Sequence, residues 1–206
     1  MKTAIILAGG RSERFGQDKG TVLLAGKPLV SHVFERAHRV AEEAIIVVGS
    51  TKQKEDYLPL FPKGTKISVD LKDSQSPLVG ALTGFTNARG EYSILLPCDT
   101  PFVSTEIMEL LFDIAPGMDA VIPKWPNDYI EPLQAVYRTD SALAAARSAL
   151  EKGEARIRSM ISLLRVRYVS TMVIEQLDPH LTTFFNINTQ MDLKKAEALI
   201  KKKMPS

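Results

Sequence analysis

Cysteine is nearly absent from this sequence, since Cys98 is its one cysteine in 206 residues. A single thiol excludes an internal disulfide and a cysteine-rich metal cluster, and it suits a reducing compartment. Apolar runs of membrane-spanning length are also missing, and the short apolar stretch near the start does not fit a secretory signal. We therefore expect a cytoplasmic protein.

An excess of charge of one sign is missing too. The chain has 26 Lys and Arg against 24 Asp and Glu, a formal net charge of +2. This balance gives no broad field to attract nucleic acid or a membrane, and the run 201–203 of lysines is interpreted as a solvated helix end. Contents of 45% hydrophobic and 24% charged residues are average for a soluble globular chain. The length predicts a single domain over residues 1–206, which we expect to be a monomer.

Apolar runs alternate with amphipathic periods along the chain, which predicts an α/β fold. The spacing of apolar residues predicts helices between the runs, and His32 and His38 fall on the polar face of the first of them, where we expect them to be exposed. The expected sheet is mostly parallel, with one antiparallel strand in the C-terminal half at 133–137. The other expected strands are 4–7, 44–48, 66–69, 92–96, 120–122 and 166–173.

A glycine turn follows the first expected strand. Gly9 and Gly10 have no Cβ, so the backbone can turn sharply and approach a ligand closely. Successive N–H groups in such a turn form a concave seat for an anion. Arg11, Arg14 and Lys19 place cations within reach of that seat. This combination indicates a site for a phosphate chain.

Two better-known phosphate loops fail on spacing. A Walker loop requires Gly-Lys-Ser/Thr, whereas here Lys19 lies three residues beyond Gly16 and is followed by Gly20. A dinucleotide fold requires Gly-x-Gly-x-x-Gly and an acidic residue closing the second strand. Here the glycines are adjacent and the second strand ends in Gly49-Ser50, which argues against a nicotinamide dehydrogenase.

The pattern Leu-Ala-Gly-Gly-x-x-x-Arg-x-Gly-x-Asp-Lys, from Leu7 to Lys19, resembles the signature loop of nucleotidyltransferases. Its Asp18-Lys19 ending is most similar to the molybdenum cofactor guanylyltransferase family. The resemblance implies a three-layer, Rossmann-like nucleotidyltransferase fold. It also implies that the loop backbone holds GTP and that Lys19 contacts the phosphates. The implied nucleotide-binding residues of the loop are Leu7, Ala8, Gly9, Gly10 and Lys19, and the implied catalytic residues are Lys19, Arg14 and Asp99.

Two acidic residues follow the third and fourth expected strands of the chain. Asp70 and Asp99 therefore face the same rim as the loop, although an isolated Asp after a strand is often only a turn residue or a helix cap. A triphosphate brings Mg²⁺, which takes one or two carboxylates, and the segment 97–101 resembles the family's magnesium motif. Asp99 is the expected metal ligand, and Asp70 matches a nucleotide-contacting position.

Three further segments match the family. The segment ending in Gly80 resembles the family's border of the guanine pocket, with Ser76 in place of a glycine. Arg156, and Asn186 with Asn188 in an Asn-x-Asn motif, resemble positions near the pterin acceptor, and the guanidinium of Arg156 suits a phosphate. A cap or turn role is the alternative for both Asn residues. Trp125 and Tyr129 could stack on a pterin, but surface packing is the simpler interpretation.

The resemblance implies transfer of GMP from GTP to molybdopterin with release of pyrophosphate, with GTP and molybdopterin as partners. Residues 1–105 would bind the nucleotide and residues 106–206 the acceptor. Proteins that deliver molybdopterin, or molybdoenzymes that receive the product, are possible further partners. The alternatives are a sister enzyme that transfers a nucleotide to a sugar phosphate or cobinamide phosphate, or CMP to molybdopterin, and a non-catalytic GTP-binding module.

Overall fold

Seven strands form one mixed sheet in the computed structural model, which describes residues 1–9, 11–12, 15–71 and 76–203. Their order is β11-β9-β10-β8-β1-β6-β7, and β10 alone runs antiparallel to its neighbours. The predicted mostly parallel α/β fold is confirmed, including the antiparallel strand. The strands are β1 (Lys2–Leu7), β6 (Glu43–Val48), β7 (Lys66–Val69), β8 (Tyr92–Pro97), β9 (Ala120–Lys124), β10 (Ala135–Arg138) and β11 (Val166–Ser170).

The central strands are buried on both faces, as their continuous apolar runs predict. Alternation of side chains along β1 sends Ala4 and Ile6 into one core and Ile5 into the other. In β8, Ile94 and Leu96 likewise lie opposite Leu95. The sheet therefore separates two hydrophobic cores, each of which needs a layer of helices.

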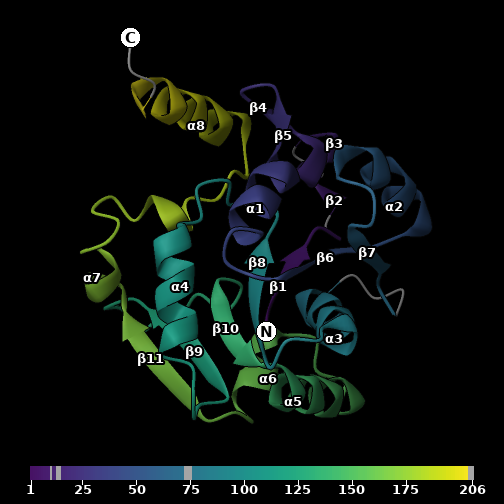
Figure 1. The fold of residues 1–206 in the computed structure, drawn as a ribbon, viewed down its shortest axis with the longest axis vertical. Coiled ribbons are helices and arrows are strands. Elements are labelled where there is room, and N and C mark those ends of the chain that lie inside the picture. Colours follow the sequence, from purple (N-terminus) through teal and green to yellow (C-terminus); the bar gives the residue numbers. More distant parts are fainter. Residues whose placement is uncertain (10, 13–14, 72–75, 204–206) are drawn as a thin grey trace.

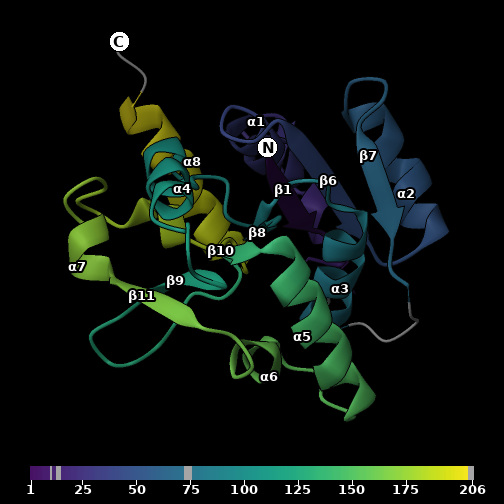
Figure 2. The same ribbon diagram turned by 60° about the horizontal axis from the view of Figure 1, so that its bottom comes forward.

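Helices supply those two layers. Residues of α1 and α4 line one core, whereas residues of α3, α5 and α6 line the other. Figure 2 shows this arrangement, with α3, α5 and α6 below the strands and α1 and α4 above them. The helices are α1 (Leu29–Ala37), α2 (Thr51–Tyr57), α3 (Pro77–Asn87), α4 (Thr105–Asp113), α5 (Thr139–Glu151), α6 (Ile157–Ile161), α7 (Thr171–Ile174) and α8 (Gln190–Lys203).

Hydroxyl groups cap the first turns of several helices. The side chains of Ser50 and Ser104 accept hydrogen bonds from backbone N–H groups in the first turns of α2 and α4. Before α8, Thr189 and Asp192 form a reciprocal capping box. Ser76, where the resembled family has glycine, caps α3 by accepting from the N–H of Val79 at 3.2 Å. The departure at Ser76 thus has a structural role.

The C-terminal helix returns to the start of the chain. Figure 1 shows α8 beside the two-stranded hairpin of β4 (Leu23–Leu24) and β5 (Lys27–Pro28). Ala196 of α8 is buried in a small third core with Val22 and Leu24 from the N-terminal segment. This packing brings the segment before α8 close to the loop that follows β1.

Two predictions about local structure are wrong. The strand predicted at 166–173 ends at Ser170, whose hydroxyl accepts from the N–H of Met172 and begins α7. His32 is half-buried rather than exposed, because its Nε2 hydrogen-bonds the carbonyl of Leu24 at 2.9 Å, and burial lowers the pKa of its imidazole. In the described part of the chain, each helix is too short or too polar to cross a membrane.

Candidate active site

The order of the strands reverses beside β1. The chain passes from β1 outward to β6 and β7 and then returns to β8 on the other side of β1. Leu7 and Pro97, the last residues of β1 and β8, are paired in register, so the loops that follow them leave the sheet together. Crevices at such switch points are where open parallel sheets bind ligands.

Three of the predicted site residues meet at this point. Lys19 donates from Nζ to the carboxylate of Asp99 and to Oδ1 of Asn188, the latter at 2.5 Å. The Lys19 and Asp99 side chains are only 17% and 13% exposed. The site thus joins the first loop, the end of β8 and the C-terminal segment through one ammonium group.

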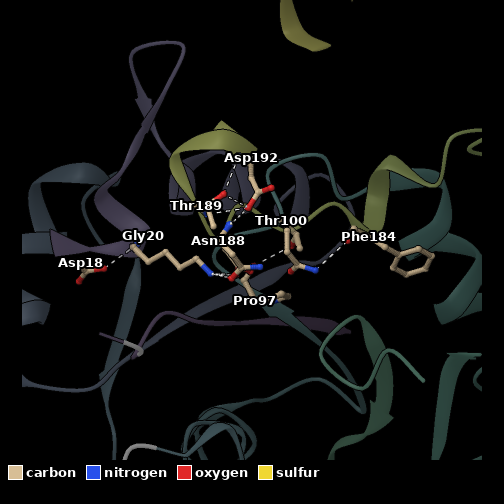
Figure 3. Close-up of polar contacts among 11 residues, drawn as sticks. Asp18, Gly20, Pro97, Thr100, Phe184, Asn188, Thr189 and Asp192 are labelled. Atoms are coloured by element: carbon tan, nitrogen blue, oxygen red, sulfur yellow. Dashed lines mark hydrogen bonds and ion pairs between the residues drawn. The ribbon is translucent and has the colours of Figure 1, made fainter. Parts of the chain in front are cut away.

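The C-terminal segment is docked on the end of β8 through its backbone. The N–H of Ile187 donates to the carbonyl of Asp99 at 2.9 Å. Asp192 accepts from the N–H groups of Asn188 and Thr189. In Figure 3, Asn188 lies below the Thr189–Asp192 cap of α8, and Asp18 lies to its left. The backbone therefore fixes Asn188 while its side chain reaches Lys19.

Asp99 has one carboxylate oxygen to offer a ligand. Its Oδ2 accepts from Lys19, whereas Oδ1 is buried and has no hydrogen-bond partner among the described residues. A buried polar atom is normally satisfied, so an unpaired carboxylate oxygen at a crevice suits a cation. In the part of the chain that the structure describes, no three His, Cys, Asp or Glu residues gather as a protein-only metal site. This chemistry fits Mg²⁺, which takes few carboxylates and completes its shell with phosphate and water.

A second part of the crevice consists of glycine residues around the carboxylate of Asp70, just beyond β7. A Cβ built on Gly9 would lie 3.2 Å from Asp70 Oδ2, and one built on Gly80 would lie 3.7 Å from Oδ1. Gly49 is similarly close to the loop, since its added Cβ would meet the carbonyl oxygen of Gly9 at 2.9 Å. Glycines thus form a cradle without side chains around one acidic group.

The carboxylate in this cradle is desolvated. Its Oδ1 is buried without a hydrogen-bond partner among the described residues, and burial raises the pKa of Asp70 to about 6. Perturbed carboxylates of this kind gather at functional sites. The carboxylate is suited to accept N–H hydrogen bonds from a bound ligand.

The other predicted residues are distributed less tightly. Leu7 ends β1 at the crevice and Ala8 follows it, while Gly10 and Arg14 lie outside the described residues. Asn186 is exposed and donates from Nδ2 to the carbonyl of Phe184, and Arg156 is exposed just before α6. Within the described ranges, no hydrogen bond or ion pair connects Arg156 with Lys19 or Asp99.

Sequence reasoning missed a contribution from α2. Gln53 and Tyr57 both hydrogen-bond the carboxylate of Asp18, the residue before Lys19. Their spacing of four places them on one face of a short helix, and Tyr57 is the only aromatic residue in that helix. This spacing was the available signal, but nothing in the sequence connects it with the loop.

The strand order 3-2-1-4 and the Lys19–Asp99 pair at its switch point are those of an α/β nucleotide-binding fold. Residues 4–169 match the family model described as the MobA-like NTP transferase domain, and the chain belongs to this family.

Named relatives extend over almost the whole chain. The "Probable molybdenum cofactor guanylyltransferase" of Methanosarcina acetivorans is 35% identical over 94% of this chain and 88% of its own length. The "Molybdenum cofactor guanylyltransferase" of Desulfosudis oleivorans is 35% identical over 97% of this chain and 96% of its own. The solved structure of "Molybdopterin-guanine dinucleotide biosynthesis protein A" from Archaeoglobus fulgidus superposes with a TM-score of 0.84 at 32% identity, covering 98% and 100% of the two chains.

Proposed function

We propose that this chain is a molybdenum cofactor guanylyltransferase, which transfers GMP from GTP to molybdopterin and releases pyrophosphate. The observation that carries the proposal is the meeting of Lys19, Asp99 and Asn188 at the switch point of a MobA-like fold. Two full-length relatives at 35% identity bear that name.

The reaction that we propose is a direct displacement at the α-phosphorus of GTP. An oxygen of the acceptor's terminal phosphate forms the new P–O bond, and the bond between the α-phosphorus and the bridging oxygen breaks. The electron pair leaves with pyrophosphate. Because the acceptor phosphate is already anionic, it needs alignment and charge neutralisation rather than a strong base.

Lys19 would supply the principal charge neutralisation. Its ammonium group lies at the crevice and is only partly exposed, so it acts in a medium of low dielectric constant. We propose that it moves from Asp99 to the phosphates when the nucleotide binds, while Asn188 continues to orient it. The N–H groups of the loop after β1 would hold the same phosphates.

Asp99 would hold Mg²⁺ through Oδ1, the oxygen that has no partner among the described residues. When bound, the ion would neutralise phosphate charge at the reacting centre.

Asp70 would select the base. Guanine presents N1–H and N2–H₂ as adjacent donors, and a carboxylate can accept from both with charge-assisted hydrogen bonds. Adenine and cytosine do not offer this pair of donors. Because Gly9 and Gly80 have no Cβ, no side chain from these positions crowds the carboxylate of Asp70. We therefore propose that GTP is preferred because Asp70 accepts from the guanine edge.

We propose that the acceptor binds toward the C-terminal half, residues 106–206, whereas residues 1–105 bind the nucleotide. Asn188 belongs to the acceptor half but contacts Lys19 of the nucleotide half, so it would align the two substrates. Arg156 and Asn186 are exposed and would contact the acceptor directly. The guanidinium of Arg156 suits a phosphate group.

Titration calorimetry of nucleotides tests the nucleotide half of this proposal. We expect the wild type to bind GTP more tightly than ATP, CTP or UTP, and only with Mg²⁺ present. Asp99→Asn should weaken Mg²⁺-dependent GTP binding by at least about tenfold, because even outer partners of metal ligands contribute 10- to 100-fold to metal affinity. Asp113→Asn, an exposed carboxylate on α4, is the control and should bind as the wild type does.

The outcomes separate the alternatives. A preference for CTP or UTP would assign the chain to a sister transferase, and an absence of triphosphate binding would refute the site. If GTP binds but no acceptor yields pyrophosphate, the chain is a binding module.

A further inference from the structure

The carboxylate of Asp18 is held on several sides at the start of the turn that carries Lys19. It accepts from the N–H of Gly20 at 2.9 Å, from the hydroxyl of Tyr57 at 2.8 Å and from Nε2 of Gln53. The N–H of Gly20 makes Asp18 the cap of the 3₁₀ turn Lys19–Thr21. The position of Asp18 therefore sets the position from which the Lys19 side chain starts.

The amide of Gln53 connects this turn with the sheet. Its Oε1 accepts from the N–H of Gly49 at 2.8 Å, and its Nε2 donates to the carbonyl of Ala8 at 2.7 Å as well as to Asp18. An amide uses all of these contacts at once, because it offers an acceptor on one atom and two donors on the other. A glutamate of the same shape could not donate to Ala8 and Asp18.

There is little freedom for the turn to adopt another position. A Cβ on Gly20 would lie 2.0 Å from the Tyr57 hydroxyl, so the backbone of the turn packs directly on Tyr57. Tyr57 is itself fully buried, and its phenol has a raised pKa because of that burial. The hydroxyl therefore remains a hydrogen-bond donor to Asp18 across the physiological pH range.

We propose that Gln53 and Tyr57 are positioning residues for phosphate transfer, acting through Asp18 to aim the ammonium group of Lys19 at the leaving pyrophosphate. This inference rests on the proposed function, since Lys19 is the group that the network would position. It extends the site to α2, which contributes no group that touches the substrates in the proposed reaction. Gln53 would further hold the ends of β1 and β6 at the spacing that the nucleotide needs, through Ala8 and Gly49.

Reversing the polarity of the Gln53–Asp18 contact provides a sharp test. Gln53→Glu places two carboxylates opposite one another, and Asp18→Asn places two amide N–H₂ groups opposite one another. We expect each variant to lower kcat by about tenfold or more. The double variant restores a donor opposite a carboxylate with the same total charge, and it should recover part of the lost kcat, since the donor to the carbonyl of Ala8 is not restored. Glu55→Gln, on the exposed side of α2, is the control and should leave kcat unchanged.

Recovery of kcat in the double variant separates a positioning role from a general loss of stability, because two destabilising substitutions would not raise kcat when they are combined. If the kcat of the double variant falls by the product of the two single-variant losses, the positioning role is overturned. It is also overturned if both single variants keep the wild-type kcat. Tyr57→Phe preserves the packing against Gly20 and removes one donor to Asp18. It provides a folded variant if Gln53→Glu is unstable, and its kcat should fall severalfold while its KM for GTP changes less.

Failure of the proposed function would be recognised separately. A wild-type protein that forms no guanylylated product would refute the function itself. A wild-type protein that forms product, with variants that behave as Glu55→Gln does, would refute only the role of Gln53 and Tyr57.

Discussion

Replacing Lys19 by alanine should lower the turnover of GMP transfer by on the order of a hundredfold or more, the loss seen when a preorganised group that stabilises charge is removed. The ammonium group is the one that joins the loop, Asp99 and Asn188. Its charge would be most valuable in the transition state, when pyrophosphate begins to leave. We therefore expect kcat to fall more than the affinity for GTP, with steady-state kinetics as the measurement.

The control for this experiment is Lys27→Ala. Lys27 is an exposed lysine that pairs with Glu35 at 2.8 Å on the surface, so its loss should leave kcat within about twofold, as exposed ion pairs contribute little. Thermal unfolding of both variants establishes that they are folded. Unchanged turnover in a folded Lys19→Ala protein would remove Lys19 from the mechanism.

Replacing Asp70 by asparagine should weaken GTP binding by about tenfold to a hundredfold, the value of one or two hydrogen bonds to a charged group. The amide would accept from only one of the two guanine donors and would oppose its own N–H₂ to the other. Affinity for ATP should change little, so the preference for GTP should decrease. Competition calorimetry measures both affinities, and an undiminished preference in Asp70→Asn would show that another group selects the base.

The raised pKa of Asp70 gives this variant a second signature. The folded pKa of about 6 exceeds the ordinary 3.8, so the folded state binds the proton more tightly than the unfolded state between these values. The stability that the protonated group contributes is present below pH 4 and is lost as the pH rises through 6. Asp70→Asn should consequently be more stable than the wild type above pH 6, with the difference disappearing toward pH 4.

Chemical denaturation at several pH values measures this difference. Asp56→Asn, an exposed carboxylate on α2, is the matched control and should show no such trend. A lower stability of Asp70→Asn at pH 8 would contradict the desolvated state of the carboxylate. GTP binding by the wild type should follow the opposite course and weaken below pH 6, because the protonated Asp70 no longer accepts from both donors.

Much of the fold could be predicted because its signals are local. Continuous apolar runs identify the central strands, and the spacing of apolar residues identifies the helices between them. The alignment of Asp99 with the first loop also followed from the sequence, because parallel strands end at one edge of a sheet. These features depend on residues that are neighbours in the chain or on a general property of α/β folds.

The remaining features depend on contacts between distant segments. Lys19 and Asn188 are 169 residues apart, and they meet because α8 packs against the N-terminal segment and Ile187 hydrogen-bonds Asp99. The link from Gln53 to Asp18 likewise arises from the placement of α2 beside the loop. The early end of β11 reflects a local competition, in which the Ser170 hydroxyl caps α7 and ends an otherwise suitable strand.

The most direct test of the central claim is a product assay. The chain is incubated with Mg²⁺, molybdopterin and each nucleoside triphosphate in turn, and pyrophosphate and the dinucleotide are quantified together. We predict equal amounts of pyrophosphate and molybdopterin guanine dinucleotide with GTP, and little product with CTP, ATP or UTP. Formation of a different dinucleotide, or no acceptor-dependent release of pyrophosphate from GTP, would contradict the assignment.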